Sequence, residues 1–95
     1  MSGVPIVGVE LDRPRKLRMD FNAIADFEAE SGRRLGTLAD GGMSFSDMRA
    51  FVWACLRHED EGLTLHDVGS MLHPGNVLAV TEAIKQLTDG IAKND

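Results

Sequence analysis

The chain has 95 residues, of which 43% are hydrophobic and 26% charged, and it carries a formal net charge of -5 at pH 7. A chain of this length buries one modest core, so we expect a single domain over residues 1–95. No apolar run approaches the roughly 20 residues that span a bilayer, which excludes a membrane-spanning helix. The acidic balance argues against nonspecific nucleic-acid binding, because that binding needs Lys and Arg to displace counterions from phosphates.

Residues 4–20 have the pattern of a β-hairpin. Apolar residues alternate along both halves of the segment: Val7, Val9 and Leu11 in the first half, and Leu17 and Met19 in the second. Between them lies Pro14, whose fixed φ suits a turn. An isolated two-stranded hairpin is only marginally stable in water, so we expect its apolar face to pack on helices.

Residues 22–31 predict the first helix, with Phe27 facing the core. Asp20 or Asn22 can cap its N-terminus, since a side-chain oxygen there accepts a hydrogen bond from an orphan N–H group. Gly32 is well placed to end the helix, because glycine adopts the left-handed conformation without strain.

Residues 45–58 predict a second helix, which either Ser44 or Ser46 can cap. Asp47 lies favourably in the first turn, near the positive end of the helix. Apolar residues recur at steps of three and four: Phe45, Met48, Val52, Cys55 and Leu56, with Phe51 beside them. Trp53 extends the apolar surface further around the helix, so we expect this helix to be buried on two sides.

Residues 65–72 predict a third helix after the acidic turn that follows the second. Thr64 and Asp67 have the spacing of a capping box, in which each side chain accepts a hydrogen bond from the other residue's N–H. The apolar side of this helix consists of Leu65, Val68, Met71 and Leu72.

Residues 74–89 predict the last helix, with Pro74 at its first position and Gly90 at its end. Its apolar stripe consists of Val77, Val80, Ile84 and Leu87. Together these elements predict a mainly α (α+β) fold, in which an N-terminal β-hairpin packs on a bundle of about four helices.

Residues that could carry chemistry are few and poorly spaced. His58, His66 and His73 lie eight and seven positions apart and flank turns, unlike the close pairs that bind zinc. Cys55 lies on a core stripe, and no serine occupies a strand-turn-helix elbow. We therefore expect no catalytic, cofactor-binding or metal-binding residues, and no enzymatic activity.

Two groups of residues are candidates for binding another protein. Four basic residues near the predicted hairpin turn form the only concentrated positive patch: Arg13, Arg15, Lys16 and Arg18. On the second helix, Arg49 and Arg57 flank Trp53 at steps of four, and Trp and Arg are enriched at interface hot spots. Each group has a plain structural alternative, which is a solvated hairpin tip for the first and a buried tryptophan for the second.

The order of three segments resembles a known family. They are L-R-M-D-F-N-A-I-A-D-F-E-A-E-S-G (17–32), M-R-A-F-V-W-A-C-L-R (48–57) and L-T-L-H-D-V-G-S-M-L (63–72). Together they resemble the small tail assembly chaperones of long-tailed phages and the related gene transfer agents, over about residues 7–88. The shared features are structural patterns, so the resemblance carries over no catalytic or ligand-binding residue.

The resemblance implies a non-enzymatic helper that binds the tape measure protein and keeps it soluble until tail tube subunits polymerise around it. Such a protein acts in the cytoplasm of the producing cell and is absent from the finished particle. The lone Cys55 and the absence of a signal-peptide pattern agree with that location. An alternative is a small DNA-binding or adaptor protein that acts as a regulator, although the 65–72 helix has no Arg or Lys to contact DNA.

Overall fold

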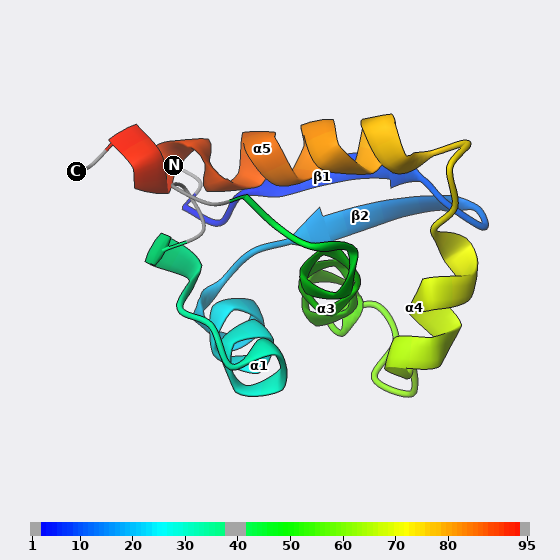
Figure 1. The fold of residues 1–95 in the computed structure, drawn as a ribbon, viewed down its shortest axis with the longest axis horizontal. Helices are drawn as coiled ribbons and strands as arrows, with labels where there is room; N and C mark the ends of the chain where they lie inside the picture. The colour runs from blue at the N-terminus through cyan, green and yellow to red at the C-terminus, as the bar shows by residue number, and fades with distance from the viewer. Residues whose placement is uncertain (1–2, 38–41, 94–95) are drawn as a thin grey trace.

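The computed structural model describes residues 3–37 and 42–93, and it confirms the predicted α+β architecture (Figure 1). A two-stranded antiparallel sheet is followed by four α-helices. The elements are β1 (Ile6–Glu10), β2 (Pro14–Arg18), α1 (Phe21–Ser31), the 3-10 helix η1 (Leu35–Thr37), α3 (Phe45–Leu56), α4 (Leu65–Met71) and α5 (Val77–Lys93).

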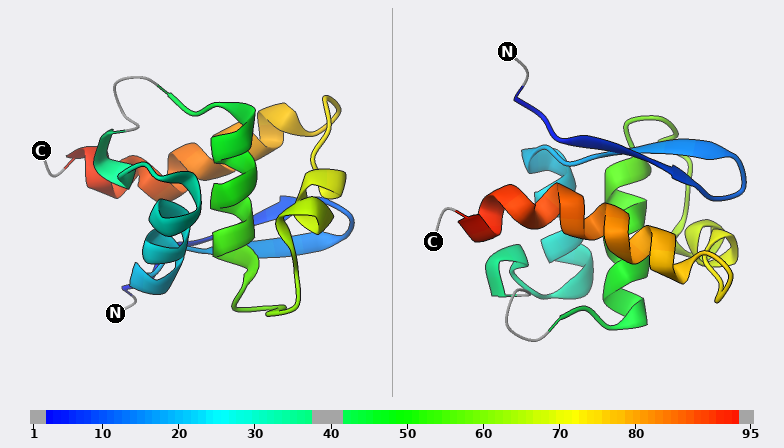
Figure 2. Two further views of the ribbon diagram at one scale, coloured as in Figure 1. Left: turned by 60° about the horizontal axis from the view of Figure 1, so that its bottom comes forward. Right: turned by 90° about the horizontal axis from the view of Figure 1, so that it is seen from above.

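Helix α3 lies at the centre of the fold. It packs against α1 on one side and α4 on the other, and it also contacts β2. Helix α5 lies along β1 and crosses α3 at a steep angle (Figure 2). The hairpin and α5 therefore cover one part of α3, while α1 and α4 flank it.

The β-hairpin has the predicted alternation, with one difference at its turn. Leu17 and Met19 are buried in the core, and Val7 is half-buried against it. Pro14 was predicted in the turn, but it opens β2 opposite Glu10. Proline is tolerated at the first residue of a strand, because the rest of the ladder keeps its N–H donors.

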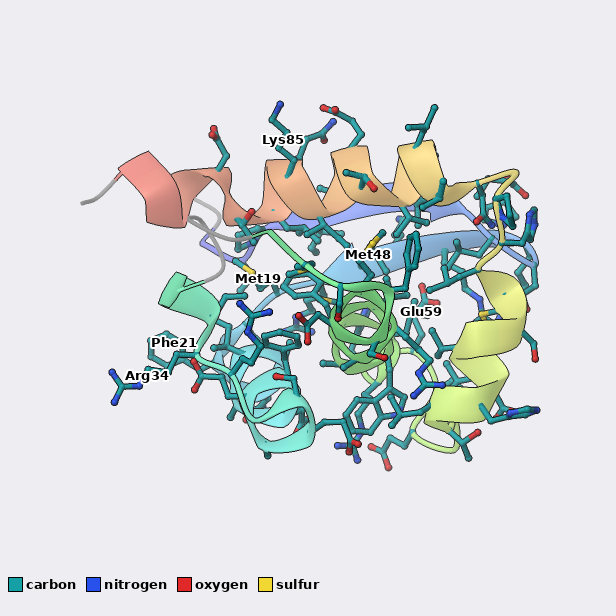
Figure 3. The ribbon with its side chains drawn as sticks, viewed as in Figure 1. Met19, Phe21, Arg34, Met48, Glu59 and Lys85 are labelled. Carbon is teal, nitrogen blue, oxygen red and sulfur yellow. The ribbon has the colours of Figure 1, made fainter. Side chains whose placement is uncertain are left out.

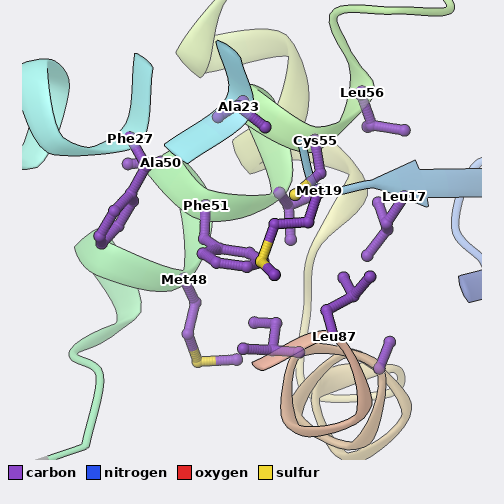
Figure 4. Close-up of a cluster of buried hydrophobic side chains, with 14 of the residues drawn as sticks. Leu17, Met19, Ala23, Phe27, Met48, Ala50, Phe51, Cys55, Leu56 and Leu87 are labelled. Carbon is purple, nitrogen blue, oxygen red and sulfur yellow. The ribbon is translucent and has the colours of Figure 1, made fainter. Parts of the chain in front are cut away.

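The core is built around α3, as its broad apolar surface predicts. The rings of Phe27 and Phe51 meet edge to face with centroids 5.6 Å apart, a favourable geometry for aromatic pairs. Figure 4 shows this cluster, with Met19 and Leu87 reaching it from other elements. Residues buried on α3 include Met48, Ala50, Phe51, Val52, Ala54, Cys55 and Leu56.

Phe45 is the exception on the predicted apolar stripe of α3. Its side chain is 78% exposed, although its spacing from Met48 and Val52 matches a core position. Phe45 is the first residue of the helix, where the stripe passes the edge of the core. Periodicity gives the direction of a side chain but not how far the core extends along the helix.

Predicted capping side chains begin three helices, two of them at the predicted residue. Ser44, rather than Ser46, caps α3 and forms a full capping box with Asp47. Thr64 caps α4 with the same reciprocal pair of hydrogen bonds. Asp20, rather than Asn22, caps α1, so that helix begins one residue earlier than predicted.

Helix ends differ from the predictions at four places. Helix α1 ends as predicted before Gly32, which has φ 74°. Helix α3 ends at Leu56, two residues earlier than predicted, and α4 ends at Met71, one residue earlier.

Helix α5 was predicted over 74–89, and it spans Val77–Lys93 instead. It starts late because the Asn76 side chain holds the preceding turn with hydrogen bonds to residues 71 and 73. Gly90 does not stop it, since one glycine costs a helix only about 0.5–1 kcal/mol.

Substitution of the two serines tests the choice of cap. Ser44→Ala is expected to lower the free energy of unfolding by about 1 kcal/mol, because Asp47 N–H loses its acceptor. Ser46→Ala is the matched control and is expected to change it by less than about 0.5 kcal/mol. Urea denaturation followed by far-UV circular dichroism measures both values. Equal effects of the two substitutions would contradict the cap.

Candidate functional site

One of the four basic residues predicted at the hairpin is buried rather than open to solvent. The Arg15 side chain is only 4% exposed and forms two hydrogen bonds of 2.9 Å with Asp12. The pairing lowers the pKa of Asp12 and raises that of Arg15. Arg13 and Lys16 are exposed. Arg15 therefore belongs to the internal structure of the hairpin.

The Arg15 side chain also ties the hairpin to the turn after α3. Its Nη1 atom lies 3.7 Å from the Glu59 carboxylate. Close by, His58 Nε2 lies 2.8 Å from the Lys16 carbonyl oxygen, and Lys16 N–H donates to Glu59. These polar contacts explain why the acidic turn lies beside the basic hairpin.

Trp53 is half-buried, and it is held by a hydrogen bond at its edge and by a cation over its ring. Its Nε1–H donates to the Leu63 carbonyl oxygen at 2.9 Å. The Arg57 guanidinium lies 5.0 Å from the centre of the indole ring and also forms an ion pair of 3.0 Å with Asp26. Arg49, by contrast, lies against Gly69 of α4. Of the three predicted residues, Arg57 and Trp53 therefore contact each other, and Arg57 pairs with α1 while Arg49 lies against α4.

A polar recess between α1, β2 and α3 brings together two predicted residues. Arg18 and Arg57 line it, and its volume is about 280 Å³. Arg18 lies 3.6 Å from Asp20, and Arg57 pairs with Asp26. Because both arginines have carboxylate partners within the recess, little net charge is left to attract a ligand.

A larger hollow, which we call the α3–α5 groove, lies where the first turns of α3 and α5 meet the end of α4. Its volume is about 510 Å³. The lining is mostly apolar, and its only residue with a permanent charge is Arg49. The lining residues are Phe45, Ser46, Met48, Arg49, Gly69, Leu72, His73, Pro74, Val77 and Val80.

The apolar surface of the groove reaches the solvent at Phe45, which lines the groove and is 78% exposed. Figure 3 shows Met48 between α3 and α5, at the inner side of this region. The groove and the exposed Phe45 ring therefore form a surface suited to an apolar partner.

The sequence pointed to Arg49 but missed the rest of this site. Phe45 was predicted in the core, and Leu72 and Val77 were predicted only as helix stripe residues. One signal could have identified Phe45, because the Ser44 capping box places it at the first helical position. Nothing in the sequence shows that the ends of three helices meet.

Two kinds of reactive group can be checked among the described residues, namely metal-binding clusters and the cysteine thiol. Within the described ranges, no three His, Cys, Asp or Glu side chains are placed to hold a metal ion. Burial raises the pKa of the Cys55 thiol to about 12, so it stays protonated at neutral pH and is a poor nucleophile. None of the described helices is long and apolar enough to cross a bilayer.

Comparison with known proteins gives no further assignment. No protein-family model, no curated protein and no solved structure matches this chain.

Replacement of the two neighbouring arginines of the hairpin tests their different roles. Arg15→Ala is expected to lower the free energy of unfolding at neutral pH by more than about 1 kcal/mol, since it removes a buried side chain and its ion pairs. Arg13→Ala is the control, with a change within about 0.5 kcal/mol. Urea denaturation at several pH values gives both numbers.

Arg15→Ala is also expected to change how the free energy of unfolding depends on pH. A carboxyl group with a lowered pKa stabilises the fold above its ordinary pKa and loses that contribution as pH falls through the lowered value. The wild-type protein should therefore lose the Asp12 contribution in acid below about pH 4, whereas Arg15→Ala should lack this loss. Parallel acid profiles for the two proteins would contradict the pairing.

Reaction with a thiol reagent tests the burial of Cys55. At mildly alkaline pH the native protein is expected to react far more slowly than the urea-unfolded protein, because the thiol is buried and its pKa is about 12. Absorbance of the released chromophore measures both rates. Comparable rates in the two states would show that Cys55 is accessible.

Proposed function

We propose that this chain is a non-enzymatic tail assembly chaperone that binds the tape measure protein and keeps it soluble until tail tube subunits polymerise. Two observations support the proposal. The ordered segments at 17–32, 48–57 and 63–72 resemble that family. The α3–α5 groove, with the exposed Phe45 in its lining, offers an apolar surface to a partner protein.

The observation that carries a binding function is the exposed apolar surface of the groove. The Phe45 side chain is 78% exposed, and it lines a hollow whose other lining residues are mostly apolar. Burial of apolar surface yields about 25 cal/mol per Å², so a partner segment that covers this region gains most of its affinity there. A bound segment would in turn be hidden from other aggregation-prone segments.

Release follows from the small size of the surface. The groove is a local hollow on a chain with a radius of gyration of 12.3 Å. An interface of this kind is reversible, and tube subunits that cover more of the tape measure protein displace the chaperone by competition. The net charge of -5 disfavours association between copies of the chaperone itself.

Co-expression with the neighbouring tape measure and tube proteins tests the proposal. We expect the tape measure protein to stay soluble and to co-purify with this chain. Phe45→Ser should reduce capture about fivefold or more, as for a contact worth about 1 kcal/mol, with an unchanged melting temperature because the side chain is exposed.

Phe21→Ser is the matched control. Phe21 is also the first residue of a helix and is 87% exposed, but it lies away from the groove (Figure 3). Capture should therefore be unchanged. No co-purification of wild-type protein with either partner would refute the proposal, and salt-sensitive binding to duplex DNA would instead favour a regulator.

A further inference from the structure

Arg49 is the one permanently charged residue among the described residues that line the α3–α5 groove. Its side chain is half-buried, and its Nε atom is shielded from solvent without a hydrogen-bond partner within residues 3–37 and 42–93. A buried donor left unpaired costs about 1–3 kcal/mol, and more when it is charged. No hydrogen bond or ion pair within the described residues offsets the burial of this Nε atom.

The comparable arginines of the described chain all have carboxylate partners. Arg15 and Arg18 also have one buried nitrogen without a hydrogen bond, but carboxylates lie 3.7 Å and 3.6 Å from those nitrogens. The ion pairs of the buried and half-buried arginines are Arg15–Asp12, Arg18–Asp20, Arg33–Asp47 and Arg57–Asp26. Among the half-buried or buried arginines that the structure describes, Arg49 is the exception.

Gly69 of α4 gives the Arg49 side chain its room. A Cβ atom at position 69 would lie 3.1 Å from Arg49 Cδ and 3.8 Å from Arg49 Nη1. The first distance is tighter than an ordinary van der Waals contact. Glycine is otherwise unfavourable inside a helix by about 0.5–1 kcal/mol. Glycine at position 69 therefore leaves the space that the Arg49 side chain occupies.

Two helix ends add to the positive potential of the groove. Phe45 and Ser46 are the first residues of α3, Val77 is the first residue of α5, and all three line the groove. The N-terminus of a helix carries a partial positive charge that favours an anion. Asp47, which is also in the first turn of α3, is already paired with Arg33 and with the Ser44 N–H.

From these observations we infer that the α3–α5 groove binds an apolar segment of a partner protein that presents an aspartate or glutamate carboxylate to Arg49. This inference rests on the proposed protein-binding function and adds the chemistry of the bound segment. Apolar residues of the segment contact Met48, Leu72 and Val80, while its carboxylate accepts hydrogen bonds from the guanidinium that lacks a partner.

A protein segment suits this surface better than a small carboxylate or a second copy. The apolar lining extends from the exposed Phe45 of α3 to Val77 and Val80 of α5, so several side chains of one bound segment can contact it together. A second copy brings another net charge of -5, which opposes self-association. Both alternatives are separate outcomes of the test below.

Selection of peptides against the immobilised full chain tests the inference without assuming which protein is the partner. The probe is a display library of random linear peptides. We expect the selected peptides to share an aspartate or glutamate flanked by apolar residues. The best peptide, labelled with a fluorophore, then gives dissociation constants by anisotropy for the wild-type protein and its variants.

Three variants separate binding from folding. Arg49→Met removes the unpaired charge but keeps an apolar side chain, so we expect an equal or higher melting temperature and at least about tenfold weaker binding, which corresponds to about 1.4 kcal/mol. Gly69→Ala should raise helix propensity and displace Arg49, so binding weakens severalfold in a stable protein. Arg49→Glu should abolish binding, and a peptide with lysine in place of its acidic residue should regain it.

Lys85→Glu is the charge-matched control for Arg49→Glu. Lys85 is exposed on the outer face of α5, away from the groove (Figure 3). Its substitution should leave the dissociation constant within about twofold, since exposed charges at a distance are screened.

Several outcomes overturn the inference. They are a selection that yields no peptide, selected peptides without a shared acidic residue, or affinity that is unchanged by Arg49→Met. Binding of a fluorescent fatty acid in place of peptides, or a dimer that Arg49→Glu dissociates, assigns the groove to another occupant. If these occur while the tape measure protein still co-purifies, the proposed function stands and only the groove assignment fails.

Discussion

Burial of α3 on more than one side is the constraint on which the rest of this fold depends. Helices α1 and α4, strand β2 and the side chains of α5 all pack around it. A chain of 95 residues has little apolar surface to spare. One central helix that is apolar around most of its circumference lets a two-stranded hairpin and short helices share a single core.

Polar side chains then fix the ends of the elements around that core. Asp47 is buried, and it completes the Ser44 capping box while pairing with Arg33 after α1. Arg15 plays a similar part on the other side, where it joins the hairpin to the turn after α3. These ion pairs link segments that are distant in sequence, and they neutralise charges that would otherwise face the solvent unpaired.

This use of charge bears on function. Three of the six basic residues that stand out in the sequence, Arg15, Arg18 and Arg57, have carboxylate partners in the structure, so they are poor candidates for contacts with a partner protein. Arg49 differs because it lies in an apolar groove without a carboxylate. Because of this contrast, the region where α3, α4 and α5 meet is a better candidate for a partner contact than the hairpin tip.

The sequence by itself determined the local structure of this protein. Capping residues such as Ser44, Thr64 and Gly32, and apolar spacing along α3, act over a few residues, so their effects can be read from neighbouring positions. Only the tertiary structure decided that Phe45 lies outside the core, that Arg15 is buried, and that the ends of three helices form a groove around Arg49. These features depend on how helices cross and where the core ends, and neither the period of a helix nor its caps contains that information.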